Sequence, residues 1–203
     1  MKKTKQIILQ TAKKLFTKHG VAEVSIRQIA AEMKISHSNL LYHYKNKQAL
    51  LTGLHQQLLD AALVINRDFH QTDELVKALY HSTQTGFRIL YDYRFFVIDL
   101  NHIMRENTKL HQTFLQIGKF RDQLYREIIA KGIEKGYMRT PEYQNEYELF
   151  LQRIRIFSDY WVASSAIYEE GNQEDIIDKY VRSFMNMFYP YLTQKGKVEY
   201  LLL

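Results

Sequence analysis

The sequence predicts an all-α protein with a three-helix helix-turn-helix domain followed by a larger helical bundle, about nine helices in total. Only two prolines, at positions 141 and 190, interrupt its 203 residues. Apolar residues recur at helical spacing almost throughout, and the alternation typical of β-strands is scarce. Two serines in the first quarter each precede a short apolar-periodic run, which is a signal for the start of a helix. These observations divide the chain into a small domain, residues 1–47, and a larger domain, residues 48–203.

The first predicted helix ends at Gly20, and one of its faces is apolar. That face consists of Ile8, Ala12, Leu15 and Phe16. Lys13 and Lys14 interrupt the apolar stretch, which is therefore not a signal peptide. No run approaches the ~18–20 apolar residues of a membrane span. We therefore expect a soluble, cytoplasmic protein that does not bind a membrane.

Two short helices follow, and each begins with a serine cap. Ser25 and Gln28 have the spacing of a capping box, in which each side chain accepts a hydrogen bond from the backbone amide of the other residue. Ser36 caps the next helix. Because only Lys34 and Ile35 separate the two helices, they must cross steeply, which is the helix-turn-helix arrangement.

The second of these helices, about residues 36–44, is unusually polar for its position between apolar segments. Leu40 and Leu41 are its only plainly apolar residues. A helix that lies in the major groove of DNA needs such a surface, because its side chains bond to base edges and phosphates. The alternative is a short polar helix at the protein surface. The residues predicted to contact DNA are Ser25, Arg27, Ser36, His37, Ser38, Asn39, Tyr42, His43, Lys45 and Lys47.

The charge distribution favours the DNA-binding interpretation. Residues 1–50 contain ten Lys and Arg against Glu23 and Glu32, a net charge of +8. The whole chain carries +6, so residues 51–203 carry −2. Lys45 and Lys47 flank Asn46, a predicted helix cap, where a cation is unfavourable unless a phosphate is bound. The sequence thus predicts a basic module that binds double-stranded DNA, joined to a near-neutral one.

The small domain resembles the amino-terminal signature of the TetR family of bacterial transcriptional regulators. The resemblance rests on residues 25–30 (SIRQIA), 35–36 (IS), 40–44 (LLYHY) and 47–51 (KQALL). It implies a homodimer that binds a palindromic operator, and a larger domain that binds a small effector. Lys34 stands where the family often has glycine, so it must adopt a left-handed conformation at a cost of ~1–2 kcal/mol. Ser38 and Asn39 also depart from the common pattern, which leaves the operator sequence open.

Six further helices are predicted, over about residues 47–69, 72–91, 94–104, 109–135, 141–168 and 174–189. Thr72 or Asp73 is expected to cap the helix that ends near residue 91. Thr140 and Pro141 are interpreted as a cap followed by proline at the first helical position. Residues 196–203 are expected to fray.

The last two long helices carry apolar residues on more than one face, which predicts that one face packs against a second subunit. The residues predicted at this dimer interface are Phe150, Ile154, Phe157, Trp161, Ile177, Tyr180, Phe184, Met187 and Phe188. The alternative is that both helices are central within one chain.

Fifteen Tyr, eleven Phe and one Trp make the chain rich in aromatic residues. Aromatic walls with a few polar groups suit a small hydrophobic or aromatic effector, and ordinary core filling is the alternative. The residues predicted to line an effector pocket are Tyr80, Phe87, Tyr91, Phe96, His102, Phe114, Tyr125 and Trp161. No metal and no cofactor are expected, because there are no cysteines and the histidines lack the spacing of metal ligands.

The sequence contains no nucleophile elbow, glycine-rich phosphate loop or HExxH motif, so we do not expect an enzyme. The expected function is that of a DNA-binding transcriptional regulator, a ligand-responsive repressor. One alternative is an effector-independent architectural or adaptor DNA-binding protein. Another is a protein–protein module whose basic amino terminus serves only solubility.

Overall fold

The structure is a computed structural model that describes residues 2–62 and 74–203, and within these ranges it is all-helical apart from one isolated β-bridge. The α-helices are α1 (Lys2–His19), α2 (Ile26–Glu32), α3 (His37–His43), α4 (Lys47–Ala62), α5 (Leu75–Asp92), α6 (Arg94–Ile98), α7 (Leu100–Glu106), α8 (Thr108–Glu134), α9 (Glu146–Tyr168), α10 (Gln173–Asn186) and α11 (Gln194–Tyr200). A 3-10 helix, η1 (Tyr189–Tyr191), lies between α10 and α11. The predicted fold class is confirmed.

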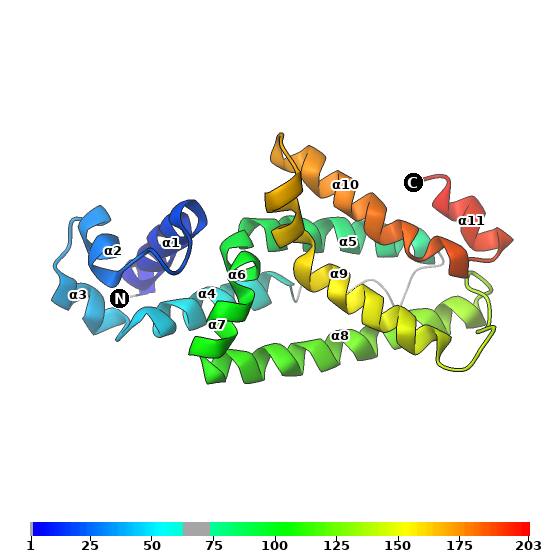
Figure 1. Cartoon of the computed structure of the whole chain (residues 1–203), viewed down its shortest axis with the longest axis horizontal. Helices are drawn as coiled ribbons and strands as arrows, with labels where there is room; N and C mark the ends of the chain where they lie inside the picture. Colours follow the sequence, from blue (N-terminus) through cyan, green and yellow to red (C-terminus); the bar gives the residue numbers. More distant parts are fainter. Residues whose placement is uncertain (1, 63–73) are drawn as a thin grey trace.

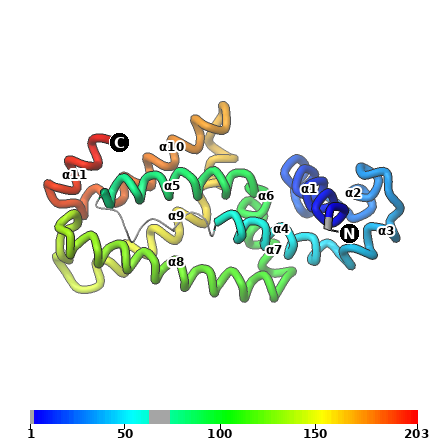
Figure 2. Tube along the Cα trace, turned by 180° about the vertical axis from the view of Figure 1, so that it is seen from behind, coloured from blue at the N-terminus to red at the C-terminus, as the bar shows by residue number. Residues whose placement is uncertain are grey.

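The helices form a small and a large group (Figure 1). Helices α1–α3 gather at one end, and α5 and α8–α11 form the larger bundle. Helix α4 runs from the first group toward the second, and α6 and α7 lie at the boundary, as the view from behind also shows (Figure 2).

The described residues contain more helices than the nine expected, for two reasons. The predicted helix over 94–104 is two helices, because Asp99 leaves the helical conformation (φ −94°, ψ 16°) between α6 and α7. Residues 196–203 were expected to fray, but most of them belong to α11. Thr193 caps this helix, because its side chain accepts a hydrogen bond from the Gly196 amide. The predicted extension of α4 to residue 69 and the caps at Thr72 and Asp73 lie outside the described residues.

The predicted start of the helix at Pro141 is wrong, because α9 begins at Glu146. Asn145 adopts a left-handed conformation (φ 65°) that breaks the chain immediately before α9. The Glu146 carboxylate then accepts a hydrogen bond from the Glu142 amide at 2.7 Å, which folds the segment 141–145 back over the helix start. Glu146 is itself held by Arg139, whose guanidinium lies over the ring of Tyr191, so the arrangement also depends on a residue far along the chain.

Two apolar cores hold the molecule together. The larger lies between α5, α8, α9, α10 and η1. The smaller is formed by α1–α3 and the first half of α4, including Leu50 and Leu54, and it also takes in Phe95, Phe96 and Ile103 from α6 and α7. Helices of the larger domain therefore supply part of the core beneath the helix-turn-helix, and this packing holds the two domains in contact.

Candidate nucleic-acid interface

The predicted capping box at the start of α2 is present. The Ser25 hydroxyl accepts a hydrogen bond from the Gln28 amide at 3.3 Å, and the Gln28 side chain accepts one from the Ser25 amide at 2.7 Å. Ser36 caps α3 in the predicted way, because its hydroxyl accepts a bond from the Asn39 amide at 3.1 Å. These two caps fix where each helix of the pair begins.

The turn between α2 and α3 depends on Lys34, which has a φ of 55°. This is the left-handed conformation expected from the sequence, and it costs a non-glycine residue ~1–2 kcal/mol. The strain is offset by two backbone bonds of 3.0 Å, from the Lys34 amide to the Ala31 carbonyl and from the Ile35 amide to the Ala30 carbonyl. The turn therefore sets a fixed angle between α2 and α3.

Helix α3 is anchored at one residue and exposed along most of its surface. Leu40 is fully buried in the smaller core. His37, Ser38 and Asn39 are exposed on the first turn, and Tyr42 is 75% exposed. These four side chains are therefore accessible to a partner in solution.

Three other residues predicted to contact DNA, Arg27, Lys45 and His43, differ in their exposure to solvent. Arg27 and Lys45 are exposed and have no ion-pair partner among the described residues. His43 is half-buried at the end of α3, where its ring meets that of Tyr42 edge-on at 5.2 Å. Its Nδ1 is buried and has no hydrogen-bond partner in the described part of the chain.

Lys47 differs from the rest, because its amine already has two acceptors. The Nζ atom donates to the Val21 carbonyl at 2.7 Å and to the Ala22 carbonyl at 3.2 Å. Burial lowers the pKa of Lys47, and nearby Glu23 and Asp99 partly oppose this shift. Asn46 caps α4 as predicted, accepting a bond from the Ala49 amide at 2.8 Å. A phosphate contact by Lys47 stays a prediction.

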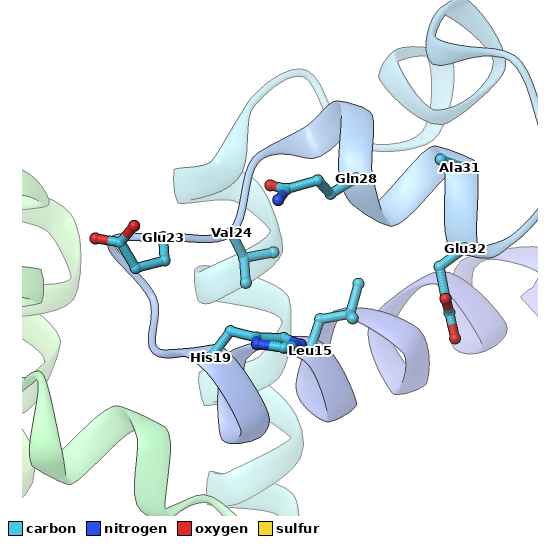
Figure 3. Close-up of a pocket in the computed structure, with 7 residues that line it drawn as sticks. All are labelled: Leu15, His19, Glu23, Val24, Gln28, Ala31 and Glu32. Carbon is cyan, nitrogen blue, oxygen red and sulfur yellow. The ribbon is translucent and has the colours of Figure 1, made fainter.

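A hollow of about 560 Å³ lies between α1 and α2 (Figure 3). It is lined by Leu15, His19, Glu23, Val24, Gln28, Ala31 and Glu32. Glu23 and Glu32 are the two acidic residues among the first fifty, and their carboxylates would repel DNA phosphates. We therefore assign this hollow no part in contact with the DNA backbone.

The residues predicted to line an effector pocket do not lie in one place. Phe87, Tyr91 and Trp161 stack together in the larger core, with Phe87 and Trp161 ring centres 4.6 Å apart. Tyr80 and Tyr125 pack against the same core, and burial raises the pKa of Tyr125 to about 12. This cluster remains a candidate pocket wall.

The structure does not bring the other three predicted pocket residues together with this cluster. Phe96 stacks on His55 in the smaller core, with ring centres 5.2 Å apart. His102 is exposed on α7. Phe114 lines a surface hollow of about 620 Å³ between α7, α8 and α9, together with Leu100, Asn101, Met104, Arg105, Thr108, His111, Leu115, Asp159 and Tyr160. Helical periodicity could not reveal that the break at Asp99 turns α6 toward the smaller domain.

Six of the nine residues predicted at the dimer interface are buried inside the single chain, and an interface at these positions stays a prediction. These are Phe150, Ile154, Trp161, Ile177, Phe184 and Phe188, none more than 2% exposed. Phe157, Tyr180 and Met187 are half-buried against the same core. The faces of α9 and α10 that carry these nine residues are covered because α5, α8 and η1 pack on them.

The structure instead exposes large apolar residues that sequence reasoning did not select. On α9, Leu149, Ile156, Tyr160 and Ile167 are 43–74% exposed. Their spacing of seven, four and seven residues places them along one side of the helix. The exposed residues of α10 are polar: Gln173, Glu174, Asp175, Lys179, Arg182, Ser183 and Asn186. The free apolar surface of the last two helices thus belongs to α9.

Comparison with known proteins places this fold in a family. The model of the family described as "Bacterial regulatory proteins, tetR family" matches residues 8–54. A second model, described as "Bacterial transcriptional repressor", matches residues 55–200. The chain therefore belongs to the TetR family of helix-turn-helix transcriptional regulators, as the resemblance indicated, and it is a regulator of transcription and not an enzyme.

Individual proteins are similar to this chain in sequence or in fold. An uncharacterized HTH-type transcriptional regulator of Bacillus subtilis, YerO, is 25% identical over 183 residues, 77% of this chain. The match spans 62% of the length of that relative. A TetR-family regulator from Marinobacter aquaeolei has a TM-score of 0.82 at 20% identity, covering 98% of this chain and 96% of that one. FadR from Bacillus subtilis, in complex with stearoyl-CoA, has a TM-score of 0.65 at 16% identity, covering 90% and 98%.

Two further findings concern membrane spans and metal sites in the described residues. No helix in residues 2–62 or 74–203 is both long and apolar enough to cross a membrane. Within the same residues, His, Asp and Glu side chains form no group of three or more that would hold a metal ion.

Proposed function

We propose that this protein is a cytoplasmic, ligand-responsive repressor that binds a palindromic operator as a homodimer. The observation that carries the proposal is α3, which is anchored by buried Leu40 and presents His37, Ser38, Asn39 and Tyr42 to solvent. Side chains of these types bond to base edges in the major groove. The flanking cations Arg27 and Lys45 are suited to the phosphates on either side.

Dimerisation is supported by the exposed apolar side of α9. Ile156 and Tyr160 lie four residues apart on this side, and Ile167 follows about two helical turns after Tyr160. Ion pairs hold α9 against α8, with Arg121 and Asp159 at 2.6 Å and Arg155 and Asp122 at 2.8 Å. A rigid apolar surface of this kind is typical of a subunit interface. A two-fold dimer formed there would present two copies of α3 to two operator half-sites.

An effector site is supported by the aromatic cluster around Trp161. The indole Nε1 of Trp161 is buried and has no acceptor among the described residues. A buried donor without an acceptor is unfavourable by ~1–3 kcal/mol, and a ligand with an oxygen atom would relieve this cost. Phe87 and Tyr91 stack beside the indole and suit a flat or apolar ligand. The acyl-CoA bound to the FadR structure makes long-chain acyl compounds reasonable first candidates.

The proposal is tested by selecting DNA from a randomised duplex library with the full-length protein, at 150–200 mM salt. A palindromic consensus recovered by a dimer would support it. Candidate effectors are then added to the protein–DNA complex. Release of the DNA by a small molecule supports the ligand-responsive repressor, whereas a complex that no compound affects favours the effector-independent architectural or adaptor protein.

A further inference from the structure

Two side chains from distant parts of the chain hold the backbone of Val21. The Val21 amide donates to Asp99 Oδ2 at 2.8 Å, although the two residues are 78 positions apart. On the other side, Lys47 donates to the Val21 and Ala22 carbonyls. Val21 lies in the turn between α1 and α2, Asp99 at the junction of α6 and α7, and Lys47 at the start of α4. Three elements therefore meet at one residue, which joins the helix-turn-helix domain to the larger domain.

The local backbone is shaped for this contact. Gly20 has a φ of 82°, a left-handed conformation that favours glycine, and it ends α1. A Cβ atom at Gly20 would lie 3.8 Å from Asp99 Oδ2, so the carboxylate passes close over this glycine. The Val21 side chain is only 2% exposed and is part of the smaller core. The turn is thus held by the buried Val21 side chain and by hydrogen bonds to both the amide and the carbonyl of Val21.

Charge strengthens the contact on both sides. Hydrogen bonds made by an ionised carboxylate or ammonium group are stronger than those between neutral groups. Asp99 and Lys47 carry opposite charges, and the field of Asp99 acts to raise the pKa of Lys47 against the larger effect of burial. The hydrogen bond from the Val21 amide to the Asp99 carboxylate is therefore stronger than a bond between neutral groups, and it favours one orientation of the two residues.

The neighbouring contacts at the domain boundary include aromatic rings as well as aliphatic side chains. Phe16 meets Phe95 at 5.6 Å between ring centres, and the amine of Lys13 lies 3.8 Å from the centre of the Tyr93 ring. Such contacts resist separation of the domains, and their energy depends less sharply on angle than that of a hydrogen bond. The bond from Val21 to Asp99 requires a particular alignment.

We propose that Asp99 is a positioning residue for DNA binding, which fixes the angle at which the larger domain presents α3 to the groove. It touches no DNA itself and acts through the amide of Val21. Without it, the helix-turn-helix domain samples more orientations, and only a fraction of them fits a given operator. The inference rests on the proposed contact of α3 with DNA and is independent of any effector.

The test compares Asp99→Ala with Asp99→Asn, which keeps an acceptor oxygen, and with Glu106→Ala, an exposed carboxylate on α7. Hydrogen exchange of the Val21 amide reports the bond directly. The distance between spin labels at Ala31→Cys and Gln116→Cys reports domain orientation, because the chain has no other cysteine. Affinity and its salt dependence are measured on the duplex selected by the wild-type protein.

Asp99→Ala is expected to exchange the Val21 amide about tenfold faster and to lower duplex affinity about tenfold. The label distances should broaden, and the salt dependence should stay unchanged because no phosphate contact is lost. Asp99→Asn should restore most of the protection and affinity, and Glu106→Ala should match the wild type. If Asp99→Ala does not fold, Asp99→Ser removes the acceptor from reach with a smaller change.

Unchanged exchange and distances in the folded Asp99→Ala protein would overturn the proposal. So would faster exchange with duplex affinity within twofold of the wild type, since the bond would then be structural only. If the wild-type protein selects no duplex, the proposed function fails with it, and the exchange and distance measurements show separately whether the interdomain bond exists.

Discussion

Arg139 and Glu146 form a bidentate ion pair at the base of α9, with nitrogen–oxygen distances of 2.6 and 2.9 Å. The Glu146 side chain is 4% exposed, and it also accepts the bond from the Glu142 amide. The guanidinium lies over the ring of Tyr191, 5.1 Å from its centre. This pair organises the connection between α8 and α9, and it gives the first prediction.

The hydrogen bonds from Arg139 lower the pKa of Glu146 to about 2, from an ordinary value of 4.5. A carboxyl group whose pKa is lower in the folded state stabilises the protein above its unfolded-state pKa. This contribution is therefore complete above about pH 4.5 and is lost as the pH falls toward 2. In the Glu146→Gln protein, the free energy of unfolding should fall less between about pH 4.5 and pH 2 than in the wild type. Denaturant unfolding at several pH values measures this difference. Glu134→Gln, an exposed carboxylate, should unfold with the pH dependence of the wild type.

Asn39→Ala should relax the sequence preference of DNA binding by ~1–3 kcal/mol at one base pair of each half-site. The side chain is exposed, so thermal stability should change by less than ~0.5 kcal/mol. Competition between operator variants measures the preference, and Gln112→Ala on α8 serves as an exposed control. An unaltered preference would remove Asn39 from the residues that read bases.

Lys47→Ala should weaken binding to all DNA sequences and lower the salt slope by about one unit, if its amine also reaches a phosphate. The loss of its bonds to the Val21 and Ala22 carbonyls should cost ~1–3 kcal/mol of folding stability. Lys45→Ala, at an exposed neighbour, should change the slope without this loss. A stability loss with the wild-type salt slope would restrict Lys47 to holding the turn.

Ile156→Glu should convert the dimer to a monomer, because it places a charge in the proposed apolar interface. Light scattering coupled to size exclusion measures the mass in solution. Val198→Glu makes the same change at a residue of similar exposure on α11, 54% against 55%, and should leave the mass unaltered. Phe184→Ala should instead destabilise the fold by ~3–5 kcal/mol, since its side chain is fully buried. A dimer that survives Ile156→Glu would move the interface elsewhere.

Trp161 is the single tryptophan of the chain, so its fluorescence reports on the aromatic cluster alone. A compound that binds beside Phe87 and Tyr91 should change this emission in a saturable way. Titration with stearoyl-CoA and with small aromatic amphiphiles measures the effect, and the same compounds should release operator DNA. A compound that releases DNA without changing the emission would place the effector site away from the cluster.

The sequence by itself determined the local features of this protein. Ser25, Ser36 and Asn46 cap the predicted helices, and Lys34 forms the strained turn, because capping and turn geometry depend on neighbours a few residues away. The all-helical class and the polar surface of α3 follow in the same way from short-range periodicity.

Only the tertiary structure decided which apolar faces are free and how the domains are joined. Phe184 and Ile156 both lie on apolar-rich helices, yet one is fully buried and the other is 55% exposed. The position of α6 against the smaller core, and the bond between Val21 and Asp99, depend on residues that meet across 78 positions of chain. Periodicity shows that a helix has an apolar face, but the partner that covers this face is set by the packing of the whole chain.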